Sequence, residues 1–309
     1  MAITTDQKAT VHTRRLPFWV WLLVGAAAAV FGLAPWLVTG ARLPIQNLWE
    51  TGIPSEGMPF ALLPFSQYWL PFLVSLVVTG SAVAGIIARA AHARRSRFAV
   101  VAVLAGVLAV QLTALVQTAV VVRAGLSAQQ WSVYYLLALV AATVLAIGIG
   151  ILVLLLVAKA PVPGATIALA VAAISAGSWL GGLVVPIGAI DTPPMWIFSA
   201  LRWVPAVLVG LAIAWCGFRS VGRVVGVVVS LLALWIGPAA ETAIASAAGT
   251  RVLAKYPGEM LEYGLGVFRA AMGMPELVVP PLVVAAAVGI AGSFGLRALA
   301  ARRRGGDAA

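Results

Sequence analysis

The stretch SVYYLLALVAATVLAIGIGILVLLLVA, residues 132 to 158, runs for 27 residues without a charged side chain. A helix needs about twenty mostly apolar residues to cross a hydrocarbon core of about 30 Å, so this segment is long enough to cross a membrane once. A transmembrane β-strand would alternate apolar and polar residues over about ten positions, and this stretch does not. It therefore predicts an all-α, helical integral membrane protein.

The composition of the whole chain agrees with this interpretation. Of its 309 residues, 62% are hydrophobic and only 9% are charged, whereas soluble domains carry about 25% charged residues. The apolar runs recur along the whole length, which favours one membrane domain over separate soluble domains. We expect a basic tail over 1–15, a transmembrane domain over 16–300 and a second basic tail over 301–309.

Eight apolar runs have the length that a membrane-spanning helix requires. They cover residues 16–39, 69–91, 98–122, 132–158, 165–188, 197–217, 224–247 and 279–300. An even number of crossings places both ends of the chain on the same side of the membrane. The sequence therefore predicts a polytopic bundle of about eight helices.

Lysine and arginine collect on alternate connections between these spans. The two termini and the even-numbered connections carry fourteen of the twenty Lys and Arg and two of the nine acids. The other side carries the remaining six Lys and Arg and the remaining seven acids. Because Lys and Arg are enriched in cytoplasmic connections, we expect both termini to be cytoplasmic. The net charge of +11 then fits contact with anionic inner-leaflet lipids, where each cation contributes about 1 kcal/mol, better than contact with nucleic acid.

Arginine outnumbers lysine 17 to 3, and alanine, valine and glycine are abundant. This usage is typical of a GC-rich bacterial genome, so we expect a multi-pass protein of the bacterial cytoplasmic membrane. The same topology makes the lipid bilayer its principal partner.

The seventh predicted span contains WIGPAAETAIASA, residues 235 to 247, with a proline and a carboxylate among apolar residues. If the span begins just after Arg223, Glu241 lies about 27 Å along the helix at 1.5 Å per residue, close to the outer edge of the core. Pro238 removes the helical hydrogen bond to the carbonyl of Leu234 and can open a kink. Two interpretations stay open: Glu241 marks the helix end in interfacial water, or it is a functional acid within the span.

The third predicted span carries two polar stripes. Gln111 and Thr118 lie about 20° apart around the helix, and Thr113 and Gln117 lie about 40° apart on nearly the opposite side. Either these side chains hydrogen-bond across helices, or one stripe lines a hydrated cavity. The second alternative defines a candidate polar path made of Gln111, Gln117, Trp235 and Glu241.

Two connections on the predicted outer side are long. Residues 41–68 are rich in Pro, Gly and aromatic residues, so we expect them to lie on the membrane interface or to fold over the bundle. This connection also contains the acids Glu50 and Glu56. In the last connection, an apolar stripe at helical spacing predicts a short amphipathic helix over 257–274 that lies flat on the outer leaflet. The stripe consists of Leu261, Leu265, Phe268 and Met272.

The sequence lacks the zinc-protease, Walker A and serine-hydrolase motifs, and the single cysteine, Cys216, has no second thiol with which to share a metal. We therefore predict no metal and no cofactor. The leading hypothesis is a small permease or transporter-like subunit. The second is a non-catalytic membrane partner of an envelope enzyme or transport complex. The third is a lipid-linked glycosyl or acyl transferase with Glu50 or Glu56 as its base, which ranks last because no convergent partner group is visible.

Overall fold

The computed structural model describes residues 15–46, 48–50, 57–185, 194–250 and 252–306. Within these residues every regular element is a helix, and the only β-type pairings are two isolated bridges. The long helices are α1 (Phe18–Val38), α2 (Leu70–Ala90), α3 (Ala99–Gly125), α4 (Gln130–Lys159), α5 (Val162–Val184), α7 (Val204–Cys216), α8 (Val221–Gly249), α9 (Pro257–Met272) and α10 (Pro275–Gly306). The shorter ones are η2 (Gln67–Trp69), η3 (His92–Arg94), α6 (Met195–Leu201) and η4 (Val252–Lys255).

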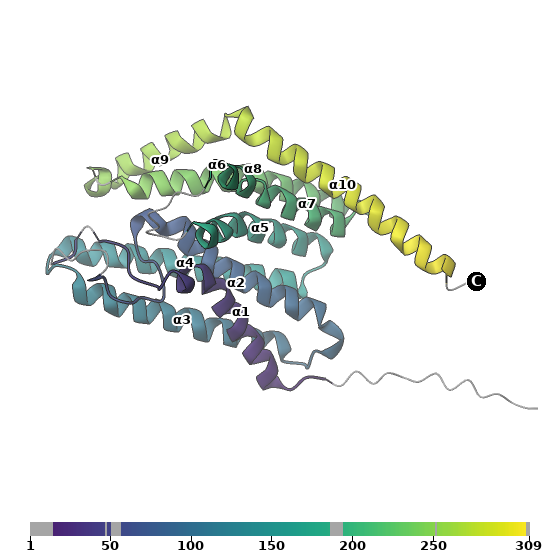
Figure 1. Ribbon diagram of the computed structural model, residues 1–309, viewed down its shortest axis with the longest axis horizontal. Coiled ribbons are helices and arrows are strands. Elements are labelled where there is room, and N and C mark those ends of the chain that lie inside the picture. The colour runs from purple at the N-terminus through teal and green to yellow at the C-terminus, as the bar shows by residue number, and fades with distance from the viewer. Residues whose placement is uncertain (1–14, 47, 51–56, 186–193, 251, 307–309) are drawn as a thin grey trace, which may run out of the picture.

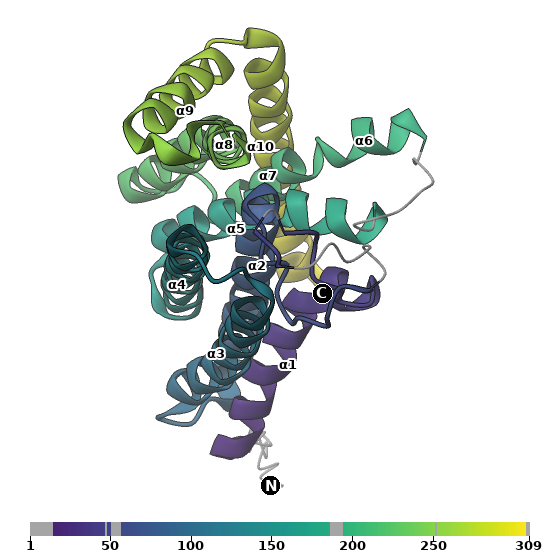
Figure 2. The same cartoon turned by 90° about the vertical axis from the view of Figure 1, so that its left-hand side faces the viewer.

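The described residues contain eight helical segments long and apolar enough to cross a membrane, the number that the sequence predicts. The sixth was predicted as one helix over 197–217, and the structure divides it into α6 and α7 at Arg202 and Trp203. Pro205 accounts for the break because it has no N–H to donate to the carbonyl of Leu201. Figure 2 shows α6 directed away from the other helices. At the end of the chain, α10 continues to Gly306, so the predicted second tail begins inside a helix.

The helices form two groups that share α5 (Figure 1). In the first group, α2 packs against α1 and α4, and α1 packs along α3; in the second, α7 packs against α10 and α5 packs against α7 and α8. Trp179 of α5 donates its indole N–H to the carbonyl of Gly32 in α1 at 2.8 Å. Its ring also stacks on Phe31 with ring centroids 5.0 Å apart. A helix of the second group is thereby anchored to the first.

The described part of the connection between α1 and α2 folds over one end of the first group of helices, here called the loop end. The side-chain carbonyl of Gln117 accepts from the backbone N–H of Leu62 at 2.9 Å, and its amide group donates to the carbonyl of Phe60 at 3.1 Å. Trp36 donates to the carbonyl of Ala61 at 2.7 Å. Leu63, the residue after Leu62, is buried. Of the two expectations for this connection, the described part fits folding over the bundle.

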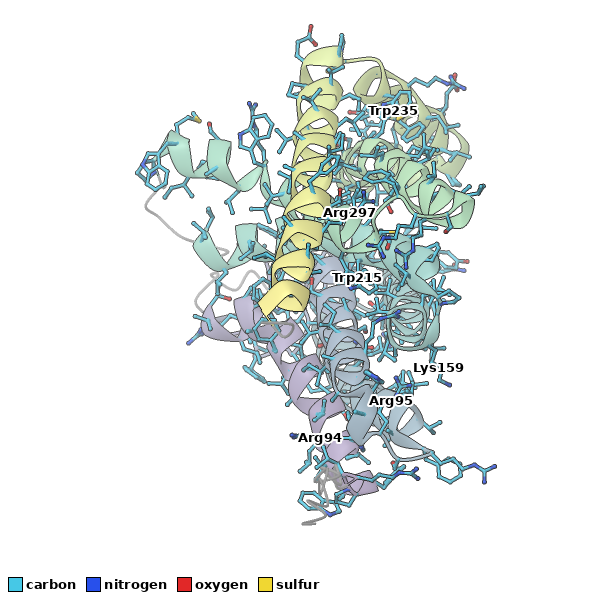
Figure 3. All side chains as sticks on the ribbon, turned by 90° about the vertical axis from the view of Figure 1, so that its right-hand side faces the viewer. Arg94, Arg95, Lys159, Trp215, Trp235 and Arg297 are labelled. Atoms are coloured by element: carbon cyan, nitrogen blue, oxygen red, sulfur yellow. The ribbon has the colours of Figure 1, made fainter. Side chains whose placement is uncertain are left out.

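The opposite end of the bundle carries a group of described cations that includes Arg94, Arg95, Lys159 and Arg297 (Figure 3). Arg89 donates to the carbonyls of Val157 and Ala160 at 2.7 and 3.0 Å. A cation at a helix C-terminus is stabilised by the helix dipole, so Arg89 ties α2 to the end of α4. The assignment of this end to the cytoplasm stays a prediction.

The predicted amphipathic segment is a helix, α9. It runs back along the end of α8: a methyl group on Gly264 would lie 3.2 Å from Cβ of Ala247, and Trp235 donates to the carbonyl of Met272 at 3.4 Å. These contacts pair the start of α9 with the end of α8 in an antiparallel arrangement. The expected position flat on the outer leaflet stays a prediction.

Candidate functional site

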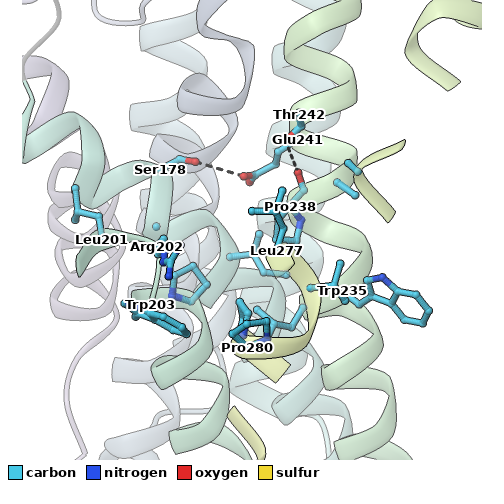
Figure 4. A pocket seen from close by; sticks show the side chains of 18 of the residues that line it. Ser178, Leu201, Arg202, Trp203, Trp235, Pro238, Glu241, Thr242, Leu277 and Pro280 are labelled. Carbon is cyan, nitrogen blue, oxygen red and sulfur yellow. Dashed lines mark hydrogen bonds between the residues drawn. The ribbon is translucent and has the colours of Figure 1, made fainter. Parts of the chain in front are cut away.

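A cavity of about 480 Å³ lies between α5, the α6–α7 break, α8 and the start of α10. Most of its wall is apolar. Glu241 projects from α8 toward Ser178 of α5 (Figure 4). The cavity is the place where the second group of helices brings ionisable and polar side chains together.

Glu241 is half-buried, and α8 continues past it to Gly249. The carboxylate therefore does not end the helix. Its Oε2 atom accepts from the hydroxyl of Ser178 on α5 at 3.4 Å (Figure 4). In the following position, Thr242 donates its hydroxyl to the carbonyl of Pro238 at 2.9 Å. Glu241 thus has a polar neighbour from a different span.

Four prolines from three helices line this cavity. They are Pro205 of α7, Pro238 of α8, and Pro280 and Pro281 of α10. Pro238, Pro280 and Pro281 lie inside helices, so each cannot donate to the carbonyl four residues earlier and leaves that acceptor without its helical partner. Pro205 lies in the first turn of α7, where an N–H has no partner within the helix. The residues that carry these carbonyls are Leu234, Glu276 and Leu277, and all three also line the cavity.

The cavity wall carries three groups that can be charged: Arg202, Glu241 and Glu276. Arg202 and Glu276 are exposed at the rim. The guanidinium of Arg202 lies over the ring of Trp203, 4.7 Å from its centroid. Neither carboxylate forms an ion pair with Arg202 within 4.0 Å. The cavity therefore holds two carboxyl groups and one cation that are not paired with one another.

The candidate polar path is divided between the two groups of helices. Trp235 and Glu241 line the cavity, with Trp235 at its edge, and neither glutamine does. Gln111 donates to the carbonyl of Val77 and the hydroxyl of Ser81 on α2, both at 3.1 Å. Gln117 binds Leu62 and Phe60 of the connection between α1 and α2. Gln111 therefore bonds across helices, which was the first of the two alternatives for the third span, whereas Gln117 bonds to a connection and not to a helix.

Glu50, in the long connection between α1 and α2, does not line this cavity. The backbone N–H of Glu50 donates to the carbonyl of Gly125 at 2.9 Å, so Glu50 is held beside the end of α3, and its side chain is exposed. Glu56 lies outside the described residues. Among the residues that the structure does describe, no group of three or more His, Cys, Asp or Glu could hold a metal ion, and Cys216 is buried in α7.

Sequence reasoning missed Ser178, Arg202 and Glu276 as members of this site. One signal was available: the sixth, seventh and eighth predicted spans each have a proline inside them, and these are the prolines that meet at the cavity. Their convergence depends on how α7, α8 and α10 pack, which the spacing within one span does not encode.

Comparison with family models, with curated proteins and with solved structures gives no match. The class of the protein follows from its fold: the described residues supply eight helical segments suited to crossing a bilayer, and this defines a multi-pass membrane protein. Its activity has to be inferred from the cavity around Glu241.

Proposed function

We propose that the protein is a small permease, or the transporter-like subunit of a larger one, in the bacterial cytoplasmic membrane. The cavity around Glu241 is its substrate site in this proposal. The observation that carries it is the half-buried carboxylate of Glu241, which lies in a cavity walled by proline-interrupted helices. Ionisable residues within membrane spans mark substrate and ion pathways.

The broken sixth span supports the same proposal. Irregular backbone at membrane depth is tolerated where it is buried in protein or lines a water-filled cavity, and transporters commonly build their sites from interrupted helices. The break at Arg202 and Trp203 lies on the cavity wall. The volume of about 480 Å³ falls within the range of about 300–1,000 Å³ that is usual for small-molecule sites.

A second candidate function, a non-catalytic partner subunit, is favoured by the outer surface of α9. Leu261 and Leu265 of this helix are 65% and 43% exposed. They border an apolar groove of about 410 Å³ between α8 and α9. Exposed apolar patches mark contacts with lipid or protein. The transferase hypothesis has no comparable support, because Glu50 lies away from the cavity.

Cysteine labelling from each side of the membrane separates the permease from the partner subunit. In a Cys216→Ala background, Ser178→Cys places one thiol on the cavity wall. Alternating access exposes a transporter's site to each side in turn. We therefore expect a charged, membrane-impermeant thiol reagent to label this position both in spheroplasts and in inside-out vesicles.

The control is Ser230→Cys in the same background. Ser230 is fully buried in α8, where its hydroxyl bonds to the carbonyl of Gly226 at 2.8 Å, so it should stay unlabelled from both sides. Labelling of the position 178 thiol from one side alone would indicate a static pocket and would favour the partner subunit.

A further inference from the structure

We infer that the cavity around Glu241 selects a small amphiphile with a primary ammonium group. The inference deepens the proposed function and rests on the cavity being the substrate site. It follows from an excess of hydrogen-bond acceptors over available donors, from the charges of the lining residues, and from the apolar wall.

Three of the five lining residues with side-chain donors use them within the protein, and the guanidinium of Arg202, exposed at the rim, and the indole N–H of Trp203 stay available. The hydroxyl of Ser178 donates to Glu241, that of Thr242 donates to the carbonyl of Pro238, and the indole N–H of Trp235 donates to α9. A carboxylate has about four acceptor positions on its two oxygens, whereas Glu241 receives a single hydrogen bond, at 3.4 Å. The acceptor capacity of this side chain is therefore mostly unused.

The prolines add further acceptors. Three lining residues, Leu234, Glu276 and Leu277, have a backbone carbonyl that loses its helical donor because proline occupies the position four residues later. Buried polar groups normally have hydrogen-bond partners, and in a membrane these must come from protein, trapped water or a ligand. A primary ammonium supplies three N–H donors and no acceptor. A quaternary ammonium of the same charge supplies no donor at all.

The charges of the lining residues favour a cation. The two carboxylates, Glu241 and Glu276, carry one more unit of charge than the single cation, Arg202. The guanidinium of Arg202 is already stacked on Trp203. A carboxylate that is withdrawn from water gains most from a partner of opposite charge that also donates hydrogen bonds. The deeper carboxylate is Glu241, so the ammonium group is assigned to the acceptor positions of Glu241 that the hydroxyl of Ser178 leaves unoccupied.

The remainder of the wall accommodates an alkyl chain. Ile174, Phe198, Leu201 and Val278 are among its apolar members. Burial of a methylene group contributes about 0.8 kcal/mol, so an alkylammonium should bind more tightly than ammonia. The ligand is thus amphiphilic rather than a simple inorganic cation.

The test measures equilibrium binding to the full chain in phosphatidylcholine nanodiscs by calorimetry. The probes are octylammonium, octyltrimethylammonium and octyl sulfate, with empty nanodiscs subtracted to remove binding to the bilayer. We expect octylammonium to bind about tenfold more tightly than either of the others, because a hydrogen bond between charged groups changes affinity by about this factor. Equal or tighter binding of octyl sulfate or octyltrimethylammonium overturns the inference.

Variants locate the site. Glu241→Gln should weaken octylammonium binding about tenfold, and Glu276→Gln, at the exposed rim, should weaken it about threefold. Glu262→Gln is the matched control, because Glu262 is an exposed acid of α9 outside the cavity, and it should leave binding unchanged. If Glu241→Gln does not fold, the Glu276 variant and the three probes still decide the outcome. Unchanged affinity in both cavity variants contradicts the assignment.

Two outcomes separate this inference from the proposed function. If the protein selects ammonium but the thiol at position 178 is labelled from one side alone, the cavity is an ammonium-binding site and the proposed transport is wrong. Labelling from both sides without ammonium selectivity leaves a transporter for another substrate class, and the ammonium assignment is then wrong. Added phosphatidylethanolamine identifies the source of the amine: competition assigns a lipid headgroup, and unchanged binding assigns a water-soluble amine.

Discussion

Gln117 holds the connection between α1 and α2 to α3 with both the carbonyl and the amino group of its side chain. Replacement by alanine leaves the N–H of Leu62 and the carbonyl of Phe60 without these partners. Each net hydrogen bond contributes about 0.5–1.5 kcal/mol. Gln117→Ala should therefore lower the free energy of unfolding by about 1–3 kcal/mol and should expose residues 57–66 to protease. Thermal unfolding in detergent and limited proteolysis measure the two effects.

Thr113→Ala is the control on the same helix. Its hydroxyl is exposed and bonds only to the carbonyl of Ala109 in its own helix, at 2.7 Å, so its removal should leave unfolding and proteolysis nearly unchanged. Equal effects of the two substitutions would mean that the amide contributes no more to the loop than a surface hydroxyl does.

The contact between α1 and α3 depends on glycine at the point where their backbones meet. A methyl group on Gly106 would overlap the carbonyl of Leu22 and would lie 2.8 Å from the backbone nitrogen of Ala26. Gly106→Ala should push the two helices apart and lower the free energy of unfolding by about 1–3 kcal/mol. The melting temperature in detergent measures this loss.

Gly148→Ala in α4 gives the opposite expectation. No atom lies within 4 Å of a methyl group at this position, and alanine is favoured over glycine in a helix by about 1 kcal/mol. This variant should keep or raise the melting temperature. If the melting temperature falls in both variants, the loss in Gly106→Ala cannot be assigned to the contact between α1 and α3.

The orientation of the whole molecule is a prediction from charge. A reporter fused after Arg304, or inserted between Arg94 and Arg97, should read cytoplasmic, and one inserted between Ser55 and Gly57 should read external. The reason is the retention of Lys and Arg in cytoplasmic connections. Activity of cytoplasmic and periplasmic reporter enzymes gives the measurement, and a reversed pattern would turn the cavity around Glu241 toward the cytoplasm.

The sequence by itself determined the helical class and the number of candidate spans. Both depend on how each segment of about twenty residues would interact with lipid, and this is a local property. The predicted runs and the observed helices accordingly agree within a few residues at most ends. The distribution of cations is also local, so the predicted orientation required no knowledge of which helices touch.

Only the tertiary structure decided which polar groups meet. The two glutamines of the third span have the same chemistry, yet Gln111 bonds to α2 and Gln117 bonds to the outer loop. Glu241 bonds to Ser178, which lies two spans earlier, and lines one cavity with the prolines of α7 and α10. These contacts join residues far apart in the chain, and helix packing sets them. Hydropathy measures how favourably each helix interacts with lipid, and it does not determine which helix each face contacts.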